Sequence, residues 1–185
     1  METRLNIHFK KLTDPTPEIA GFFSKWENDP MLIPLIRPNK NEDDLLARKP
    51  VSVDDLVKRV QNDHTYLIYA QGELIGEMDY SVDPPHVYKQ ERGTAWIGIT
   101  IGEESGRGKR IGYQALQYLE EQIKLQGLKR IELGVFEFNT SAVKLYQKLG
   151  YKQIARIEGF TYWQGKMWQD IRMEKYLSAG NEINS

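Results

Sequence analysis

The chain has 185 residues, of which 40% are hydrophobic and 28% charged, a composition that allows one domain with a buried core and argues against disorder. Its formal net charge of −1 and its lack of cysteine exclude a globally basic nucleic-acid binder, a disulfide and a thiol nucleophile. Three widely spaced histidines, no apolar leader and no 18-residue apolar run predict a cytoplasmic protein without a metal site or membrane segment.

The first third of the chain predicts a strand and two helices on either side of a long loop. Residues 4–12 alternate hydrophobic and polar side chains, as a half-buried strand does. A helix is expected within residues 13–29, after two prolines, and another at 52–62, after a serine cap. Residues 28–50 hold four prolines and a run of charges, so we expect an irregular loop that walls a substrate site.

From residue 64 the hydrophobic pattern becomes that of strands. Residues 64–70 and 73–82 predict a hairpin, and residues 94–101 a further strand after a loop at 83–93. The chain then predicts a helix at 109–126, a strand at 129–138, a helix at 139–150, strands at 151–160 and 166–177, and a frayed tail. This order predicts a mixed α+β fold in which residues 94–137 form a right-handed crossover between parallel strands.

The sequence GRGKRIG at 106–112 lies where that crossover leaves its first strand. It does not fit a Rossmann motif, because three residues separate Gly108 from Gly112 instead of two, and it lacks the Gly-Lys-Ser/Thr of a Walker loop. Free amides at a helix start, with basic side chains beside them, nevertheless suit an anion. The alternative is a solvated charged turn. Ligand binding at the carboxyl ends of the two strands is expected on general grounds.

Two stretches together resemble the GNAT N-acetyltransferase superfamily. WIGITIGEESGRGKRIGYQAL carries the loop, and NTSAVKLYQKLGY, from Asn139 to Tyr151, matches the second family motif at each of its specified positions. The resemblance covers roughly residues 64–176 and implies a single N-acetyltransferase domain over 1–185. Its sheet would be mixed and mostly antiparallel, with a splayed parallel strand pair flanked by helices. The cofactor core would span about 94–151, with acceptor-side elements at about 13–63 and 152–177.

The resemblance implies acetyl-CoA as the co-substrate and no metal. Its pyrophosphate would be held by the loop amides of Arg107, Gly108, Lys109, Arg110, Ile111 and Gly112. The strand before the loop would run along the pantetheine arm and polarise the acetyl carbonyl through Ile99, Thr100 and Ile101. Asn139 would hydrogen-bond the cofactor, although from the residues alone it is a helix cap, and Ile99 and Ile101 are core residues. Arg110 stands where the family usually has glycine.

For catalysis, the resemblance implies that Tyr146 is the general acid that protonates the departing thiolate. From the residues alone, Tyr146 would be a packing residue on an apolar helix face. Glu77 and Asp79, on one face of the second hairpin strand, are candidates to accept the proton of the acceptor amine. Their alternative is an exposed polar face of an edge-like strand. With no cysteine and no nucleophile elbow, direct transfer in a ternary complex is expected.

The acceptor is predicted to be a small-molecule or peptide amine, because acidic and aromatic residues are frequent in the expected walls of the cleft. These are Trp26, Glu27, Asp29, Glu42, Asp43, Asp44 and Tyr88, and the alternative for them is a solvated charged loop. The closing hairpin resembles the branch of ribosomal-protein N-terminal and aminoglycoside 6′ acetyltransferases, which implies acceptor or homodimer contacts for Tyr162, Trp163 and Trp168. The alternative function is a non-catalytic acyl-CoA-binding or partner-binding module on the same fold.

Overall fold

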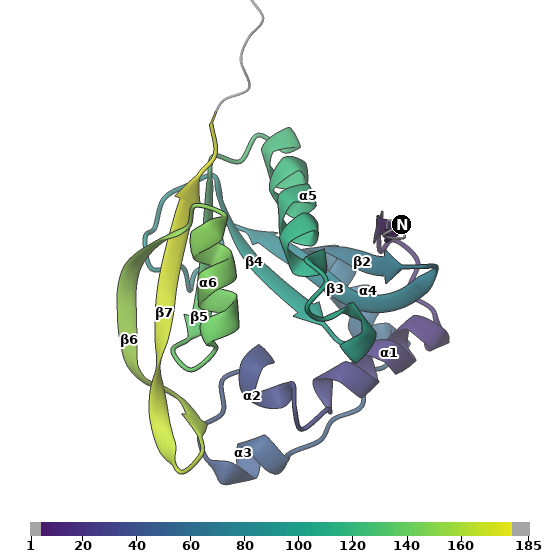
Figure 1. The fold of residues 1–185 in the computed structure, drawn as a ribbon, viewed down its shortest axis with the longest axis horizontal. Coiled ribbons are helices and arrows are strands. Elements are labelled where there is room, and N and C mark those ends of the chain that lie inside the picture. The colour runs from purple at the N-terminus through teal and green to yellow at the C-terminus, as the bar shows by residue number, and fades with distance from the viewer. Residues whose placement is uncertain (1–4, 179–185) are drawn as a thin grey trace, which may run out of the picture.

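The computed structural model describes residues 5–178, which form a seven-stranded sheet with helices on both faces (Figure 1). Residue 4 of the expected first strand, and the expected tail beyond residue 178, lie outside the described residues. In sheet order the strands are β1 (Ile7–Lys11), β2 (His64–Ala70), β3 (Glu73–Val82), β4 (Thr94–Ile101), β5 (Arg130–Phe136), β7 (Lys166–Tyr176) and β6 (Lys152–Trp163). The helices are α1 (Pro17–Glu27), α2 (Ile33–Ile36), α3 (Glu42–Leu46), α4 (Val53–Asn62), η1 (Glu104–Gly106), α5 (Ile111–Leu125) and α6 (Thr140–Lys148).

The centre of the sheet is a parallel pair that separates. β4 and β5 pair in parallel through three residue pairs, the last of which joins Trp96 to Glu132, whereas the other neighbouring strands pair antiparallel. β4 continues to Ile101 and β5 to Phe136 without pairing further, so a split opens between their carboxyl ends. The predicted fold class, a mostly antiparallel mixed sheet with a splayed parallel pair, is confirmed.

Each face of the sheet has its own hydrophobic core. On one face, α5 and α6 pack against alternate residues of the central strands, such as Met78, Ile97 and Leu133. On the other face, α1 and α4 pack against the β2 side of the sheet and bury Phe23 and Leu56. The split between β4 and β5 is therefore the place where a cavity on one face can open to the other.

The segment 28–50 is more ordered than its sequence indicates. It contains α2 and α3, so the expectation of an irregular loop was wrong for those residues. Pro34 lies in the first turn of α2, and the Asn41 side chain accepts a hydrogen bond from the Asp44 amide at the start of α3. The Tyr162 amide donates to the Asn39 carbonyl at 2.7 Å, which ties this segment to β6. A proline-rich composition does not reveal such local caps and distant contacts.

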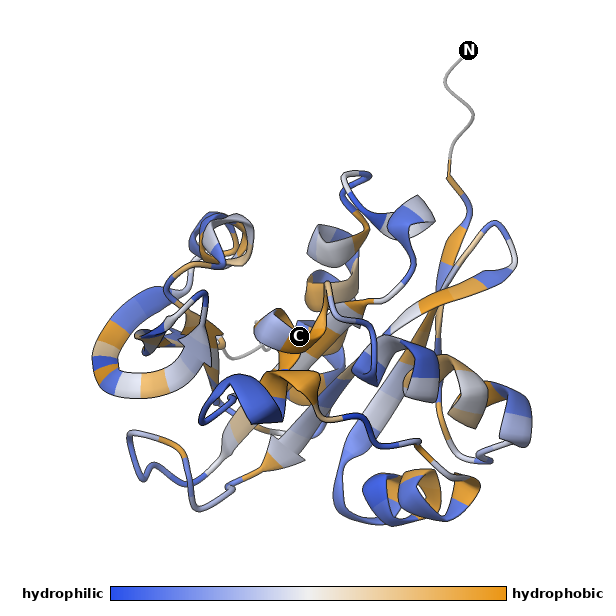
Figure 2. Ribbon diagram, turned by 90° about the horizontal axis from the view of Figure 1, so that it is seen from below, coloured by the Kyte–Doolittle hydropathy of each residue, from blue (hydrophilic) through white to orange (hydrophobic). Residues whose placement is uncertain are grey.

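Hydrophobic and hydrophilic residues are interspersed along the longer helices (Figure 2). Within residues 5–178, no helix has the length and hydropathy needed to cross a membrane.

Candidate active site

A groove of about 530 Å³ runs along the end of β4 and over the start of α5. Nine of the ten residues predicted to bind the cofactor line it: Ile99, Thr100, Ile101, Arg107, Gly108, Arg110, Ile111, Gly112 and Asn139. Lys109 is exposed and does not line the groove. The opposite wall is apolar and comes from α2 and its approach, with Met31, Leu32, Leu35 and Ile36.

The loop before α5 leaves backbone donors available. The Gln114 amide is the first to bond back along α5, to the Arg110 carbonyl at 3.2 Å. Within the described residues, the amides of Ile111, Gly112 and Tyr113 have no backbone acceptor. Such amides at the N-terminus of a 15-residue helix suit a phosphate group. The loop residues therefore fit the pyrophosphate of acetyl-CoA.

Two cations of the loop, Arg107 and Arg110, play different parts. The Arg107 guanidinium turns back and donates to the carbonyls of Ile101 and Gly102, at 3.4 and 3.1 Å, so it closes the loop onto β4. Arg110 has a left-handed backbone, with φ of 59°, and its side chain lies over the Tyr113 ring. Lys148 of α6 approaches the same ring, at 5.4 Å from its centre. Tyr113 and Lys148 were absent from the predicted site, although Lys148 belongs to the motif that carried the resemblance.

A second cavity, of about 550 Å³, occupies the split itself. It shares Ile99, Thr100 and Asn139 with the cofactor groove and reaches Tyr146 of α6. It also reaches Glu77 and Asp79, which point to the opposite face of the sheet from α6. The cavity thus connects the side of the sheet that carries the groove with the side that carries the acids.

Glu77 and Asp79 lie on β3, which is the third strand of the sheet and not an edge. They pair with Thr100 and Gly98 of β4, and both side chains are partly buried. The alternative of an exposed polar face was therefore wrong, because β2 and β4 flank β3 and α1 and α4 cover this face. Burial raises the pKa of Asp79 to about 6, with Asp63 adding to the shift. Burial, with repulsion from Asp79, raises the pKa of Glu77 well above its ordinary value.

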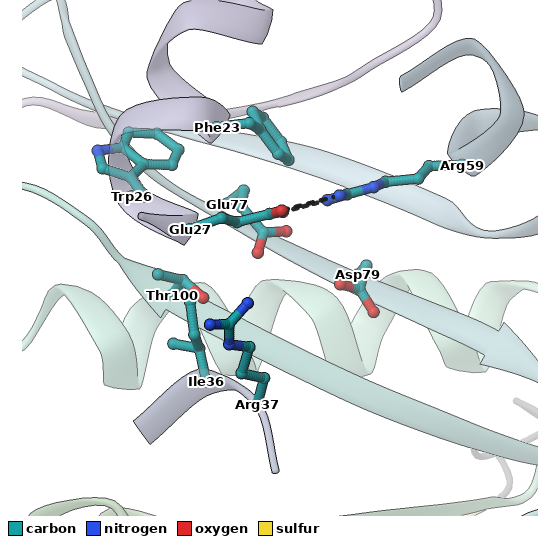
Figure 3. Close-up of a pocket in the computed structure, with 9 residues that line it drawn as sticks. All are labelled: Phe23, Trp26, Glu27, Ile36, Arg37, Arg59, Glu77, Asp79 and Thr100. Atoms are coloured by element: carbon teal, nitrogen blue, oxygen red, sulfur yellow. Dashed lines mark hydrogen bonds and ion pairs between the residues drawn. The ribbon is translucent and has the colours of Figure 1, made fainter. Parts of the chain in front are cut away.

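A third cavity, of about 310 Å³, lies above these two acids (Figure 3). Arg59 of α4 and Glu27 of α1 form a bidentate ion pair across it, and the Arg59 guanidinium also lies 5.8 Å from the Phe23 ring centre. Arg37 reaches in from the end of α2, and its guanidinium is directed toward Glu77 in Figure 3. Glu77 and Asp79 therefore lie among both positively and negatively charged side chains.

Tyr146 is 7% exposed and lies on the second turn of α6. Its ring meets the Tyr151 ring edge to face, with 5.8 Å between the ring centres, and its hydroxyl makes no hydrogen bond within residues 5–178. Burial raises the pKa of Tyr146 to about 12, so the phenol stays protonated at neutral pH. Asn139 caps α6, since its side-chain oxygen accepts from the Ala142 amide at 3.4 Å.

Residues 23–151, well over half of the chain, match the acetyltransferase (GNAT) family. The chain belongs to the GNAT acetyltransferase family. The resemblance that the loop and the second motif predicted is confirmed at the level of the family.

Individual relatives agree with this assignment. A spermine/spermidine N(1)-acetyltransferase from Bacillus subtilis is 31% identical over 86 residues, which cover 46% of this chain and 57% of that protein. The chain thus spans little more than half the length of this relative. A spermidine N-acetyltransferase from Vibrio cholerae, solved in complex with CoA and spermine, is 18% identical with a TM-score of 0.70, over 92% of this chain and 95% of that one. The Salmonella typhimurium protein yncA, solved with its cofactor acetyl-CoA, is 13% identical with a TM-score of 0.70, over 97% and 99% of the two chains. At these identities the two structures show the same fold.

The residues that were predicted to wall an acceptor cleft lie only in part at the cavities. Trp26 and Glu27 line the cavity above the acids, and His86 of the loop 83–93 lines the cavity in the split. The remaining predicted wall residues lie outside the cavities described above: Asp29, Glu42, Asp43, Asp44 and Tyr88. The closing-hairpin aromatics Trp163 and Trp168 are partly buried. Their rings pack against the Phe138 ring, with 4.4 and 5.3 Å between the ring centres.

The prediction missed residues at the far end of the split. Trp96, Gly134, Asp170 and Arg172 line the same cavity as Tyr146. Asp170 and Arg172 alternate with buried hydrophobic residues in β7. The strand pattern therefore showed that the two residues share one face of the sheet, but it did not show which residues that face contacts. Their position became clear only from the placement of β7 beside β5.

Proposed function

We propose that this protein transfers an acetyl group from acetyl-CoA to a primary amine, by direct attack within a ternary complex. The observation that carries this proposal is the split between β4 and β5, where a groove that reaches the start of α5 and an acid-lined cleft share Thr100. A donor and an acceptor that enter from the two sides would meet there. Bringing both reactants together in one geometry is itself a large part of catalysis.

The cofactor would be held mainly by backbone and by local charge. The amides of Ile111 and Gly112 would bind its pyrophosphate, and Arg110 and Lys148 would add positive field beside Tyr113. The backbone of β4 beyond Trp96 has no partner on β5, so it is available to the pantetheine arm. When bound, acetyl-CoA supplies the activated thioester.

The acid pair would accept the proton that the acceptor ammonium must lose before it can attack. A carboxyl group whose pKa is raised to about 6, as that of Asp79 is, is a better proton acceptor than an ordinary aspartate and is still ionised at neutral pH. Glu77 lies beside it, facing Thr100 across the strand pair. We assign the general base to Glu77 and Asp79 together, because two interacting carboxyl groups titrate as a pair.

Tyr146 would donate a proton to the departing sulfur. Its pKa of about 12 keeps the phenol in the donor form throughout the neutral range. The transfer to a thiolate with an ordinary pKa of about 8.5 is uphill, so the hydroxyl must lie within hydrogen-bond reach of the sulfur and regain its proton quickly. Its lack of a competing partner among the described residues leaves it available for this role.

We propose a small cationic primary amine as the acceptor, because the cavity that it would enter is bordered by three carboxylates against two guanidinium groups and by the Trp26 ring. The experiment is a screen with acetyl-CoA in which release of the free thiol is measured against alkylamines, diamines, polyamines, amino acids and peptide N-termini. Thiol release that depends on the amine, with the acetylated amine identified by mass spectrometry, is the expected result. Failure to bind coenzyme A would overturn the proposal. Binding without transfer to any of these amines would favour the non-catalytic alternative.

A further inference from the structure

Two glycines stand at matching positions on either side of the split. The last paired residues of β4 and β5 are Trp96 and Glu132, and Gly98 and Gly134 follow each of them by two residues. Because side chains alternate along a strand, both glycines face the same side of the sheet as Trp96. Each glycine leaves the floor of the cleft open at the point where the strands part.

A carboxylate from the neighbouring strand lies over each glycine. A Cβ atom at Gly98 would lie 3.3 Å from a carboxylate oxygen of Asp79 on β3. A Cβ atom at Gly134 would lie 2.7 Å from Oδ2 of Asp170 on β7 and 3.1 Å from the Trp96 ring. The cleft therefore has two carboxylates that mirror each other across the split, and only Asp79 belongs to the proposed base.

The environment of Asp170 holds it firmly and leaves one oxygen available. Its side chain is 3% exposed, and Oδ2 accepts from Arg172 Nε at 2.7 Å. Arg172 in turn donates to the His86 carbonyl at 2.9 Å and lies 4.8 Å from the Trp96 ring centre. Within residues 5–178, Oδ1 of Asp170 accepts no hydrogen bond, and the residue lines the cavity.

We propose that Asp170 forms a second acceptor subsite, which receives a hydrogen bond from a second donor group on the amine that is acetylated. This inference rests on the proposed transferase function and adds a substrate class to it: primary amines with a second ammonium or hydroxyl group a short chain away. Asp79 comes from β3 and Asp170 from β7, with β4 and β5 between them, so the second group of the acceptor would lie across the split from the amine that is acetylated.

The chemistry of the subsite selects a donor over a carboxylate. A second carboxylate on the acceptor would be repelled by Asp170, and Arg172 already pairs with Asp170 and lies 3.5 Å from Glu132. A donor group supplies the one interaction that Oδ1 lacks. Because Asp170 lines the cavity and its Oδ1 has no hydrogen-bond donor among residues 5–178, a donor group on the acceptor would add a hydrogen bond there and should improve acceptor binding measurably.

The test is the relative kcat/KM for monoamines, α,ω-diamines, amino alcohols and ω-amino acids of increasing chain length. Diamines or amino alcohols of intermediate length are expected to exceed monoamines of equal length by about tenfold, and ω-amino acids to be the poorest acceptors. A preference for diamines alone would identify an ammonium as the second group, and equal rates for amino alcohols would identify any hydrogen-bond donor. Acetylation of all these amines at equal kcat/KM, or a preference for ω-amino acids, would overturn the subsite while leaving the transferase function in place. Absence of transfer to any amine would instead overturn the proposed function.

The residue is tested by Asp170→Asn, which should reduce the diamine-to-monoamine ratio about tenfold. Glu174→Gln is the matched control, because Glu174 belongs to the same buried charge network, through Arg130 and Lys89, but does not line the cavity. Its ratio should equal that of the wild type. If Asp170→Asn does not fold, Gly134→Ala displaces the same carboxylate and should lower the ratio as well. An unchanged ratio in the folded variant would contradict the assignment.

Discussion

Arg110 holds a left-handed backbone conformation immediately before α5, and its guanidinium carbon lies 5.7 Å from the centre of the Tyr113 ring. The conformation explains why the family usually has glycine at this position, since residues with a Cβ atom adopt it at a cost. The side chain places a cation at the mouth of the cofactor groove. A strained backbone and a positive charge at the groove therefore belong to the same residue.

Arg110→Gly should separate the two effects. Relief of the left-handed strain, about 1 kcal/mol, is partly offset by the greater freedom of glycine in the unfolded chain, so we expect a gain of about 0.5 kcal/mol in the free energy of unfolding. Affinity for acetyl-CoA should fall a fewfold and depend less on salt. Urea unfolding and calorimetric titration at two salt concentrations measure these changes. Arg110→Ala is the control, because it loses the cation and keeps the strain. If Arg110→Gly were the less stable of the two, strain at this residue would be disproved.

Tyr146→Phe should reduce kcat by about 100-fold and leave the Kd for coenzyme A within a few fold of the wild type. The reason is that the hydroxyl borders the reaction cavity, whereas the ring supplies the packing against Tyr151. Tyr151→Phe is the matched control, since Tyr151 is 3% exposed and does not line the cavity. Single-turnover kinetics measure the loss at the chemical step. An equal loss in both variants would assign the effect to packing.

The sequence was sufficient for the parts of the site that are local. The bounds of β4 were predicted to the residue, and the loop and the stretch from Asn139 to Tyr151 marked the groove because each is a contiguous segment with its own pattern. The sequence showed that Arg110 departs from the motif, but it did not show that the Arg110 backbone is left-handed.

The far half of the cleft depends on contacts between distant segments. Gly134 and Asp170 meet only because β7 inserts between β5 and β6, and no periodicity within β7 states that order. Likewise, the alternative of an edge-like strand stayed open for β3 because the sequence could not match its polar face to α1 and α4. Non-local pairing, rather than weak local signals, limited the prediction.

The pH dependence of transfer should report the acid pair. We expect log kcat/KM to rise with pH through an apparent pKa near 6, well above the ordinary range of a carboxyl group, because Asp79 titrates at about 6 and the pKa of Glu77 is raised as well. Asp79→Asn removes a negatively charged neighbour of Glu77, so the rise of log kcat/KM should move to lower pH. Glu77→Gln should lower the rate on the plateau by at least about tenfold. Rates from pH 5 to 8 with one amine test this, and an unchanged limb in both variants would remove the pair from the mechanism.

The same carboxyl group should make stability depend on pH. The folded pKa of Asp79, about 6, exceeds its ordinary value of 3.8, so the folded state binds the proton more tightly. This stabilisation is complete below the ordinary pKa and is lost as pH rises through the folded pKa. Asp79→Asn should therefore raise the free energy of unfolding by about 1 to 3 kcal/mol at pH 8 and have little effect near pH 4. Urea unfolding at the two pH values measures the difference, and an equal effect at both would refute the raised pKa.

The ion pair between Glu27 and Arg59 should tune the acid pair from above. Arg59 is a cation that faces Glu77 and Asp79, and Glu27 both holds it and adds a negative charge. Arg59→Gln should raise the apparent pKa of the rate by about 0.5 to 1 unit, and Glu27→Gln should lower it by a similar amount. Arg37 and Asp63, the other charged groups nearby, are unchanged in both variants.

Opposite shifts would establish that charge acts here, because loss of packing between α1 and α4 would move both variants in the same direction. Lys25→Gln is the matched control. Lys25 is also a residue of α1, but its side chain pairs with Glu103 at 2.8 Å and does not line the cavity above the acids. Its rate profile should keep the wild-type apparent pKa. A shift in Lys25→Gln as large as that in Arg59→Gln would show that any charge change on these helices suffices, and that the position of Arg59 above the acids has no special effect.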